Sequence, residues 1–400
     1  MRLLYLIAET WPTHRADVAA LFGKYLPRHG IQSDLVTGRT SGHEGPIEWG
    51  GGEAILCNIS GGQTKKHIKT LLHGIRQLFV ADCKRYDAIQ VRDMPFLGLL
   101  GLIAARLKGL PFIYWMSYPI SEGQIAYAWE RGLSQGMMKF FFPWVRGHVG
   151  RVLLYRVVLP SAEHIFVQSA HMKQRMVERG IPADRMTPVP MGVDLEAMQP
   201  VKVDPVFDPR LKGRRALVYL GTMISTRRIE ILFDMLARVR EEVPSALLVL
   251  VGDAEDVRHK RWLLQQAESA GVAEHVIWTG WLPMSEGWRY VRAAEVGLSP
   301  VPRGPLLDVG TPTKVSEYLA LGVPVVCSDN PDQQYLVSVS ESGKCVPYRA
   351  ELFASAVLQI LFLDKESKIL MAERGAETVR VQRDYSVIAA AVSSVYFKEL

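Results

Sequence analysis

The segment 310–329 carries the residues of this chain that are best suited to binding a charged ligand. Its sequence predicts a glycine-containing loop, a short helix with Lys314 and Glu317, and a buried strand over 323–327. The free N–H groups and positive end of such a helix favour an anion such as a diphosphate. Glu317 lies further along, where a carboxylate can accept two hydrogen bonds from a ribose diol. An ordinary loop–helix–strand unit is the alternative, so the context decides.

A basic pair is the second candidate for phosphate contact. Arg227 and Arg228 follow a predicted strand over 215–220 and the residues Gly221 and Thr222, at the start of a predicted helix. Cations there oppose the preference of the helix dipole, and a bound phosphate would compensate. Arginine is a good bidentate phosphate ligand. The alternative interpretation is two surface arginines.

Other common ligand motifs are missing from the sequence. No Gly-x-Gly-x-x-Gly follows a predicted strand and no Gly-x4-Gly-Lys-Ser/Thr occurs, which disfavours a dinucleotide cofactor and a P-loop NTPase. The histidines lack metal-binding spacing, and no Asp-x-Asp is present to hold a metal against a diphosphate. We therefore expect no cofactor and no metal, with phosphate charge met by protein cations and dipoles.

Composition limits the class of protein and its location. With 400 residues the chain is long enough for two domains, and its net charge of +6 is compatible with phosphorylated ligands, a membrane surface or nucleic acid. The four cysteines are widely spaced, which favours a reducing compartment. The apolar start is too short for a signal peptide, and no uncharged stretch is long enough to span a bilayer. We expect a cytoplasmic protein.

The region 131–160 combines cations with large apolar side chains and contains no acidic residue. Interfacial helices need this combination, because rings enter the acyl boundary while cations meet anionic headgroups. The alternative is a core helix pair with one basic solvated face. We favour an anionic membrane surface over nucleic acid as the partner, with the protein peripheral on the inner face of the membrane. The cations of this region are Arg131, Lys139, Arg146, Arg151 and Arg156.

Two successive runs of alternating strands and helices predict two domains, each with a parallel sheet and right-handed crossovers. The first domain is expected over 1–195 and the second over 196–380, joined by a Pro- and charge-rich link. The last segment, 381–400, has a helical pattern and is expected to pack on the first domain. Residues 38–62 are rich in Gly, Ser and Thr and are expected to form a long loop.

The segment 310–329 strongly resembles the donor-sugar motif of glycosyltransferase family 4, in the subgroup with Pro-x-Lys-x-x-Glu-Tyr-x-Ala. The resemblance extends over 187–345. Further strings similar to family signatures are Pro190-Met-Gly-Val-Asp194, Tyr219-Leu-Gly221 with Arg228, Val251-Gly-Asp253 and Thr279-Gly-Trp281.

The resemblance implies a GT-B fold: α/β, with two Rossmann-like domains facing a central cleft and a C-terminal helix that crosses back to the first domain. It also implies a retaining, metal-independent transferase that uses a UDP- or GDP-sugar. Arg228 and Lys314 would stabilise the leaving diphosphate, and Glu317 would order the ribose. Asp308 would touch the donor sugar, because the first acid of the family's paired-Glu motif falls at Val309 beside it. The remaining donor-site residues would be Gly221, Thr222, Trp281, Leu282, and Gly310 and Thr311, whose N–H groups would hold the β-phosphate.

The first half of the chain matches the family less well. The loop 10–16 lacks the usual Gly-Gly, and the usual His is missing from 115–122. These two loops supply the acceptor-side candidates Arg15, Ser117 and Glu122. With the basic apolar region, the expected acceptor is a lipid-linked glycan in surface-polysaccharide synthesis. The alternatives are a nucleotide-sugar epimerase of the same architecture and a non-catalytic nucleotide-sugar-binding or scaffold protein.

Overall fold

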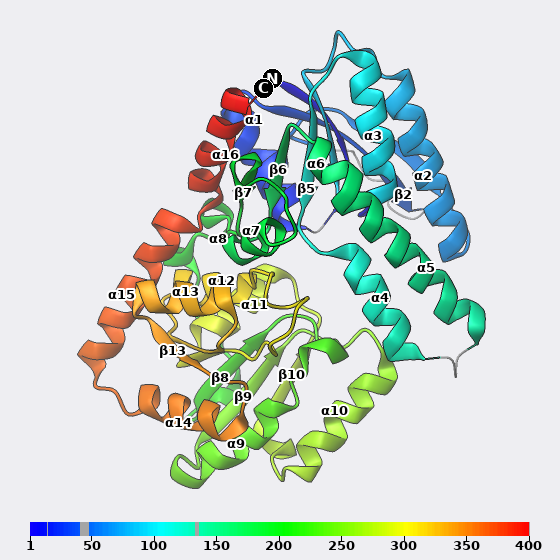
Figure 1. Ribbon diagram of the computed structural model, residues 1–400. Helices are drawn as coiled ribbons and strands as arrows, with labels where there is room; N and C mark the ends of the chain where they lie inside the picture. Colours follow the sequence, from blue (N-terminus) through cyan, green and yellow to red (C-terminus); the bar gives the residue numbers. More distant parts are fainter. Residues whose placement is uncertain (14, 41–47, 133–135, 400) are drawn as a thin grey trace. The chain divides into compact units, whose positions relative to one another are not determined.

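The computed structural model describes residues 1–13, 15–40, 48–132 and 136–399. The chain divides into two compact units (Figure 1). Unit 1 consists of Met1–Met191 together with Tyr385–Leu400, and unit 2 of Gly192–Asp384. Each unit has one parallel sheet with helices, so the expected α/β class with two Rossmann-like domains is confirmed.

Within its described residues, unit 1 contains a seven-stranded parallel sheet in the order β3-β2-β1-β4-β5-β6-β7. The central strands are mostly apolar and have almost no exposed surface, as expected for a parallel sheet that helices cover on both faces. The strands are β1 (Arg2–Leu6), β2 (Gln32–Thr40), β3 (Ala54–Ile59), β4 (Ala88–Arg92), β5 (Phe112–Met116), β6 (His164–Val167) and β7 (Met186–Pro188).

The strand β3 corrects one expectation from the sequence. It pairs in parallel with β2, which itself continues to Thr40, so 38–62 is not one long loop. Only the last residue of β3 is buried, and an edge strand with so little buried surface has no clear hydrophobic pattern. Residues 41–47 of the expected loop lie outside the described part of the chain.

The helices of unit 1 include one from the far end of the chain. The C-terminal helix α16 lies beside α1, and the two chain ends are neighbours (Figure 1). Its residues Ile388, Ala389, Val392 and Tyr396 are buried in the same core cluster as β1 and η1. The main helical segments of unit 1 are η1 (Asp17–Tyr25), α1 (Leu26–Arg28), α2 (Gln63–Val80), α3 (Pro95–Lys108), α4 (Ile120–Arg131), α5 (Met137–Leu153), η3 (Leu154–Val158), α6 (Leu159–Ser161), α7 (Ala170–Val177) and α16 (Tyr385–Glu399).

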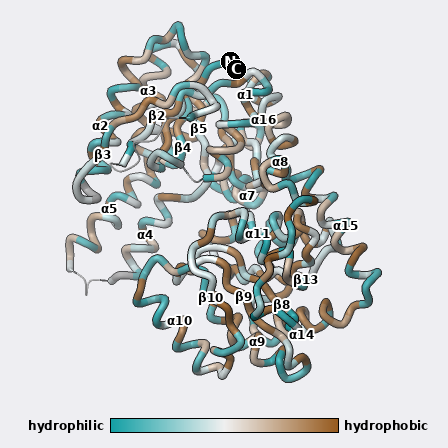
Figure 2. Tube along the Cα trace, turned by 180° about the vertical axis from the view of Figure 1, so that it is seen from behind, coloured by the Kyte–Doolittle hydropathy of each residue, from teal (hydrophilic) through white to brown (hydrophobic). Residues whose placement is uncertain are grey.

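Unit 2, all of whose residues are described, contains a six-stranded parallel sheet in the order β10-β9-β8-β11-β12-β13. Its central strands are strongly apolar, as the brown tube at β8 and β9 shows (Figure 2). The strands are β8 (Arg215–Leu220), β9 (Ala246–Val251), β10 (Val276–Gly280), β11 (Val296–Ser299), β12 (Val325–Ser328) and β13 (Gly343–Val346). The helices are α8 (Leu195–Met198), α9 (Ile231–Glu242), α10 (Val257–Ser269), α11 (Met284–Arg292), α12 (Thr313–Ala320), α13 (Pro331–Ser340), α14 (Ala350–Leu361) and α15 (Lys365–Gln382), with the short turn η7 (Ser225–Arg227) before α9.

Tyr318 fixes α12 against the centre of this sheet. Its hydroxyl accepts the N–H of Leu220 at 2.7 Å and donates to the carbonyl of Leu298 at 3.3 Å, so it joins β8 to β11. A side-chain carbon added at Gly297 would lie 2.4 Å from the Tyr318 ring, so the glycine is required for this packing. The first turn of α12 is thereby held beside the end of β8.

In both units the strand order reverses at one place, between β1 and β4 in unit 1 and between β8 and β11 in unit 2. Doubly wound sheets bind their ligands beyond the carboxyl ends of the strands at this switch point. Across the described residues, no helix is both long and apolar enough to cross a membrane.

Candidate functional site

Lys314 lies at the switch point of unit 2 and is 7% exposed. It stands in the first turn of α12, with its ammonium 3.9 Å from the centre of the Tyr219 ring. Within the described chain Lys314 forms no ion pair. Burial and the nearby Arg227 hold the pKa of Lys314 well below its ordinary value, with Glu317 opposing them. A bound anion would therefore stabilise this cation strongly.

Arg227 is the second cation at this place. A side-chain carbon built on Gly221 would lie 3.0 Å from Arg227 Nη1 and 3.6 Å from Lys314 Nζ, so both cations face the same glycine. Arg227 donates to the carbonyl of Thr222 at 3.0 Å and has no carboxylate partner among the described residues. Two cations beside a glycine turn, without a counter-ion, are suited to bind a diphosphate.

The glycine turn brings the backbone close to these two cations. Gly221 and Gly252 have φ angles of +133° and +125°, which side-chain-bearing residues rarely adopt. A side-chain carbon at Gly252 would also lie 2.4 Å from the carbonyl oxygen of Gly221. The loops after β8 and β9 thus approach each other closely, and glycine is required at both positions.

Glu317 lies on the same helix as Lys314 and is 9% exposed. The indole N–H of Trp288, on α11, donates to Glu317 Oε1 at 3.1 Å, while Oε2 has no donor among the described residues. Burial raises the pKa of Glu317, and Trp288 and Lys314 offset part of that rise. A carboxylate fixed at one oxygen and open at the other is suited to accept a hydroxyl group of a sugar or ribose.

The structure does not bring Arg228 to this group. Arg228 ends the turn η7 with a left-handed φ of +47°, and its side chain is 64% exposed beside Glu230, at 3.5 Å. The tight turn places the two neighbouring arginines in different surroundings, and Arg227 takes the position that the sequence assigned to Arg228.

The loop before α12 differs from expectation at Asp308 and Gly310. Both carboxylate oxygens of Asp308 accept bonds from Arg303, at 2.9 and 3.1 Å, so this side chain is held in a local ion pair. The N–H of Gly310 donates to the carbonyl of Leu307 at 3.2 Å, so the expectation that it is free to hold a phosphate is wrong. Thr311 is buried directly before the helix.

The loop after β10 contains two of the expected donor-site residues, Trp281 and Leu282. Trp281 is 57% exposed. Leu282 packs against the core of unit 2 and holds the loop in place.

A second buried charge cluster lies at the switch point of unit 1. Arg92, the last residue of β4, is fully buried, and its guanidinium lies 2.7 Å from Asp17 and 3.6 Å from Glu9. It also lies 3.5 Å from Asp93, a residue with a left-handed φ of +51°. Here each positive charge has carboxylates around it, in contrast to Lys314.

Two of the three acceptor-side candidates join this cluster. Arg15 donates to the hydroxyl of Ser117 at 3.3 Å, and the Ser117 N–H donates to Asp93 at 2.8 Å. Burial raises the pKa of Asp93, with Arg92 and Ser117 opposing. Burial also acts on Asp17, but Arg92 and Arg15 outweigh it and keep the pKa of Asp17 lowered. Two neighbouring carboxyl groups with pKa values shifted in opposite directions are typical of a functional site.

Glu122 lies apart from that cluster. It stands on α4, where it accepts the hydroxyl of Tyr155 at 2.8 Å and pairs with Arg179 at 2.5 Å. The structure therefore separates Glu122 from Arg15 and Ser117.

Sequence analysis missed Arg92, Asp93 and Trp288, and within the basic pair it assigned the diphosphate contact to Arg228 where the structure places Arg227. Arg92 ends the strand β4 and Asp93 follows it, at the carboxyl end of the sheet where ligands bind, so both could have been predicted from their place in the sequence. Trp288 and the choice between the two arginines depend on turn geometry and on side-chain direction. Among the described residues, no group of three or more His, Cys, Asp or Glu side chains is arranged to hold a metal ion.

Two family models match the chain, one in each unit. A model described as glycosyl transferase 4-like domain matches residues 16–192, and one described as glycosyl transferases group 1 matches residues 214–362. Together with the two parallel sheets, these matches define the class: the chain belongs to the GT-B glycosyltransferases of the family 4 class.

Two curated relatives are more specific. One is a GDP-mannose-dependent alpha-(1-6)-phosphatidylinositol monomannoside mannosyltransferase of Mycolicibacterium smegmatis, 30% identical over 46% of this chain and 48% of the relative. The other is an alpha-monoglucosyldiacylglycerol synthase of Streptococcus pneumoniae, 24% identical over 72% of this chain and 61% of the relative. The matches thus span about half to three fifths of these relatives' lengths.

Solved structures share the fold over the whole chain. Sucrose-phosphate synthase from Thermosynechococcus elongatus matches with a TM-score of 0.71 at 17% identity, over 99% of this chain and 98% of its own. HepE from Anabaena, in complex with UDP-glucose, matches with a TM-score of 0.67 at 15% identity, over 100% of both chains. At these identities the likeness shows the GT-B fold.

The two neighbouring arginines provide a matched test of the site. We expect Arg227→Gln to weaken binding of the matching nucleoside diphosphate about tenfold or more, because a charged hydrogen bond contributes about 1.5–3 kcal/mol. Arg228→Gln removes the same charge one residue away and should change affinity less than about threefold. Calorimetry measures both, with the nucleoside alone as a control that neither variant should affect. Equal losses in the two variants would refute the assignment.

Lys314 also predicts a proton linkage. Because its pKa is lowered in the protein alone and a diphosphate favours the ammonium, binding should raise that pKa and take up protons. Affinity should then fall as pH rises through the lowered pKa. Calorimetry in alkaline buffers of different ionisation enthalpy measures the uptake. The uptake should vanish in Lys314→Met and persist in Lys344→Met, an exposed lysine of β13; uptake that persists in Lys314→Met would contradict the linkage.

Proposed function

We propose that this protein transfers a sugar from a UDP- or GDP-sugar to a lipid-linked glycan acceptor of surface-polysaccharide synthesis, with retention of configuration and without a metal. We assign it to the subgroup with the Pro-x-Lys-x-x-Glu-Tyr-x-Ala donor motif. The observation that carries the proposal is the pair of cations without carboxylate partners, Lys314 and Arg227, beside the buried Glu317.

The chemistry follows from these positions. As the bond to the sugar breaks, negative charge develops on the leaving diphosphate, and fixed cations in a buried site stabilise that charge. Neither Lys314 nor Arg227 forms an ion pair with a carboxylate in the described chain, so both can contact the diphosphate directly. Glu317, held by Trp288, orders the ribose. In unit 1 we assign acceptor contact to Arg15, Ser117 and Asp93.

The names of the curated relatives support a lipid acceptor. One acts on a phosphatidylinositol monomannoside and the other is named for glucosylated diacylglycerol, so both names contain a membrane lipid. By this analogy we place the acceptor of the present chain at a membrane, and the protein as a peripheral enzyme on its cytoplasmic face.

The helix α5 provides physical support for the membrane surface. It buries Phe140, Gly147 and Gly150 on one side, which leaves large apolar residues exposed on the other. Spaced three or four apart, these exposed residues form one helix face, here called the α5 stripe. The stripe consists of Met138, Phe141, Val145, Val149 and Val152, which are 45–78% exposed. The alternative of a fully buried helix pair does not account for this face; residues 133–135 of the predicted region lie outside the described residues.

The donor site can be tested through the ribose. Wild-type protein should bind UDP or GDP about tenfold or more tightly than the matching 2′-deoxynucleotide, since the charged hydrogen bond to Glu317 is lost. In Glu317→Ala this discrimination should disappear, while thermal unfolding shows that the fold remains. Discrimination that persists in the variant would refute the role of Glu317. A thermal-shift screen with UDP, GDP and ADP selects the base, because ligand binding raises stability by mass action.

Incubation of the selected nucleotide-sugar with membrane lipids then separates the alternatives. Transfer of the sugar to lipid supports the proposal, formation of an epimer supports the epimerase, and binding without turnover supports a non-catalytic protein.

The α5 stripe predicts membrane binding that depends on apolar side chains. Replacing Met138, Val145 and Val149 by Ser should abolish flotation with anionic liposomes at low salt, because these side chains no longer enter the acyl boundary. The matched control replaces Phe362, Ile369 and Leu370, which are similarly exposed in unit 2, and should float like wild type. Circular dichroism checks the fold. If the wild-type protein fails to float, the membrane location in the proposal is wrong.

A further inference from the structure

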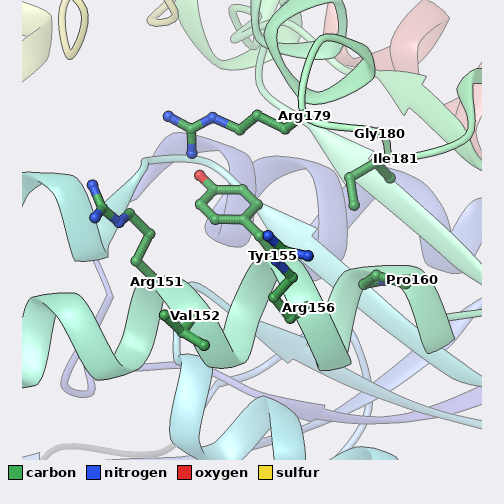
Figure 3. A pocket seen from close by; sticks show the side chains of 8 residues that line it. All are labelled: Arg151, Val152, Tyr155, Arg156, Pro160, Arg179, Gly180 and Ile181. Carbon is green, nitrogen blue, oxygen red and sulfur yellow. The ribbon is translucent and has the colours of Figure 1, made fainter.

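A pocket in unit 1 lies at the C-terminal end of the α5 stripe. It has a volume of about 700 Å³ and is lined from α5, η3, α6 and the turn after α7 (Figure 3). Its lining residues are Arg151, Val152, Tyr155, Arg156, Pro160, Arg179, Gly180 and Ile181. Three of these are arginines and none is acidic, and neither the donor site nor the acceptor cluster includes any of them.

The three arginines are held differently. Arg179 is fixed by Glu122 at 2.5 Å and lies over the ring of Tyr155, 4.3 Å from its centre. Arg151 and Arg156 have no ion pair or side-chain hydrogen bond within the described residues. Figure 3 shows the guanidinium groups of Arg151 and Arg179 on the side of the Tyr155 hydroxyl, with Arg156 near the other end of the ring.

The charge of this pocket is therefore strongly positive. One carboxylate, Glu122, lies beside Arg179, and both Arg179 and Tyr155 donate hydrogen bonds to it. Arg151 and Arg156 remain without a counter-ion in the described chain. Guanidinium groups converging on one cavity are suited to the oxygens of a phosphate.

Val152 connects the pocket to the membrane-facing surface, because it lines the pocket and is also the last residue of the α5 stripe. A ligand that uses both features has a phosphate at one end and an apolar part that continues along α5. A small soluble phosphate would leave the stripe unused.

We propose that this pocket binds the phosphorylated headgroup of an anionic membrane lipid, with the acyl region of the bilayer against the α5 stripe. The inference rests on the proposed membrane location of the enzyme and adds to it a defined phosphate site. Arg151 and Arg156 make the phosphate contacts. Arg179, held by Glu122 and Tyr155, forms the fixed wall of the pocket.

Single charge removals on one helical stretch test the site. The probes are phosphatidylcholine vesicles with phosphatidic acid, and vesicles of equal surface charge with a fatty acid in its place. On phosphatidic acid vesicles we expect Arg151→Gln and Arg156→Gln each to lose about tenfold or more in affinity. The control Lys139→Gln, an exposed cation of α5 outside the pocket, should lose about fivefold or less, the effect of one cation near an anionic surface.

On the fatty acid vesicles, which carry carboxylate in place of the phosphate monoester, all three variants should lose affinity equally. If the three variants also lose affinity equally on phosphatidic acid vesicles, the pocket arginines act only as general surface charge and the proposal is overturned. Inorganic phosphate, titrated without vesicles, distinguishes the sources. Suppose that inorganic phosphate binds the wild-type protein, that Arg156→Gln abolishes this binding, and that the variants do not differ on vesicles. That result would assign the pocket to a soluble phosphate and overturn the lipid assignment.

Failure of the proposed function is visible separately. If the wild-type protein turns over no nucleotide-sugar but the pocket variants still differ from Lys139→Gln on phosphatidic acid vesicles, the transferase proposal fails and the lipid site stands. If turnover occurs and the variants do not differ, the transferase proposal stands and the lipid site is wrong.

Discussion

Two cations without a counter-ion at the centre of unit 2 constrain the rest of that domain. A buried lysine is costly unless an anion pairs with it, and Lys314 forms no ion pair in the described chain; Arg227 disfavours its charge further, and Glu317 offsets only part of that cost. The sheet order brings the ends of β8 and β11 together, Tyr318 bonds to both strands, and Gly297 makes room for its ring. These packing contacts supply the stability that holds Lys314 in place. The electrostatic cost in the protein alone becomes binding energy when a diphosphate arrives.

Unit 1 has the same switch-point topology but the opposite electrostatic arrangement. Arg92 is surrounded by Asp17, Glu9 and Asp93, so its charge is neutralised within the domain. Such a cluster gains little from a highly charged ligand, and its hydrogen-bonding groups suit a hydroxyl-bearing one. One fold, used twice in the chain, therefore offers one site for an anion and another for a polar neutral group, as the proposed reaction between a nucleotide-sugar and a glycan requires.

The sequence was sufficient for the α/β class with two Rossmann-like domains and for the helix that carries Lys314 and Glu317, because these rest on apolar runs and a dense motif. It was not sufficient where geometry within one turn decides. Arg227 and Arg228 are chemically identical, and only the left-handed end of η7 separates them. Nothing in the sequence indicates that Arg303 forms an ion pair with Asp308. The edge strand β3 has only one buried residue, so its sequence has no clear hydrophobic pattern. Partners that are distant in the sequence, such as Trp288 for Glu317, leave no local sequence pattern that predicts their contact.

The packing of α16 has a consequence for how the chain acquires its structure. Tyr385–Glu399 completes the core of unit 1 although all of unit 2 lies between it and β7 in the sequence. During synthesis the first 191 residues therefore leave the ribosome with part of their core uncovered, while Gly192–Asp384 is contiguous and can condense as soon as it emerges. The domain made first is thus the domain finished last, because the surface against which α16 packs stays uncovered until that helix is made.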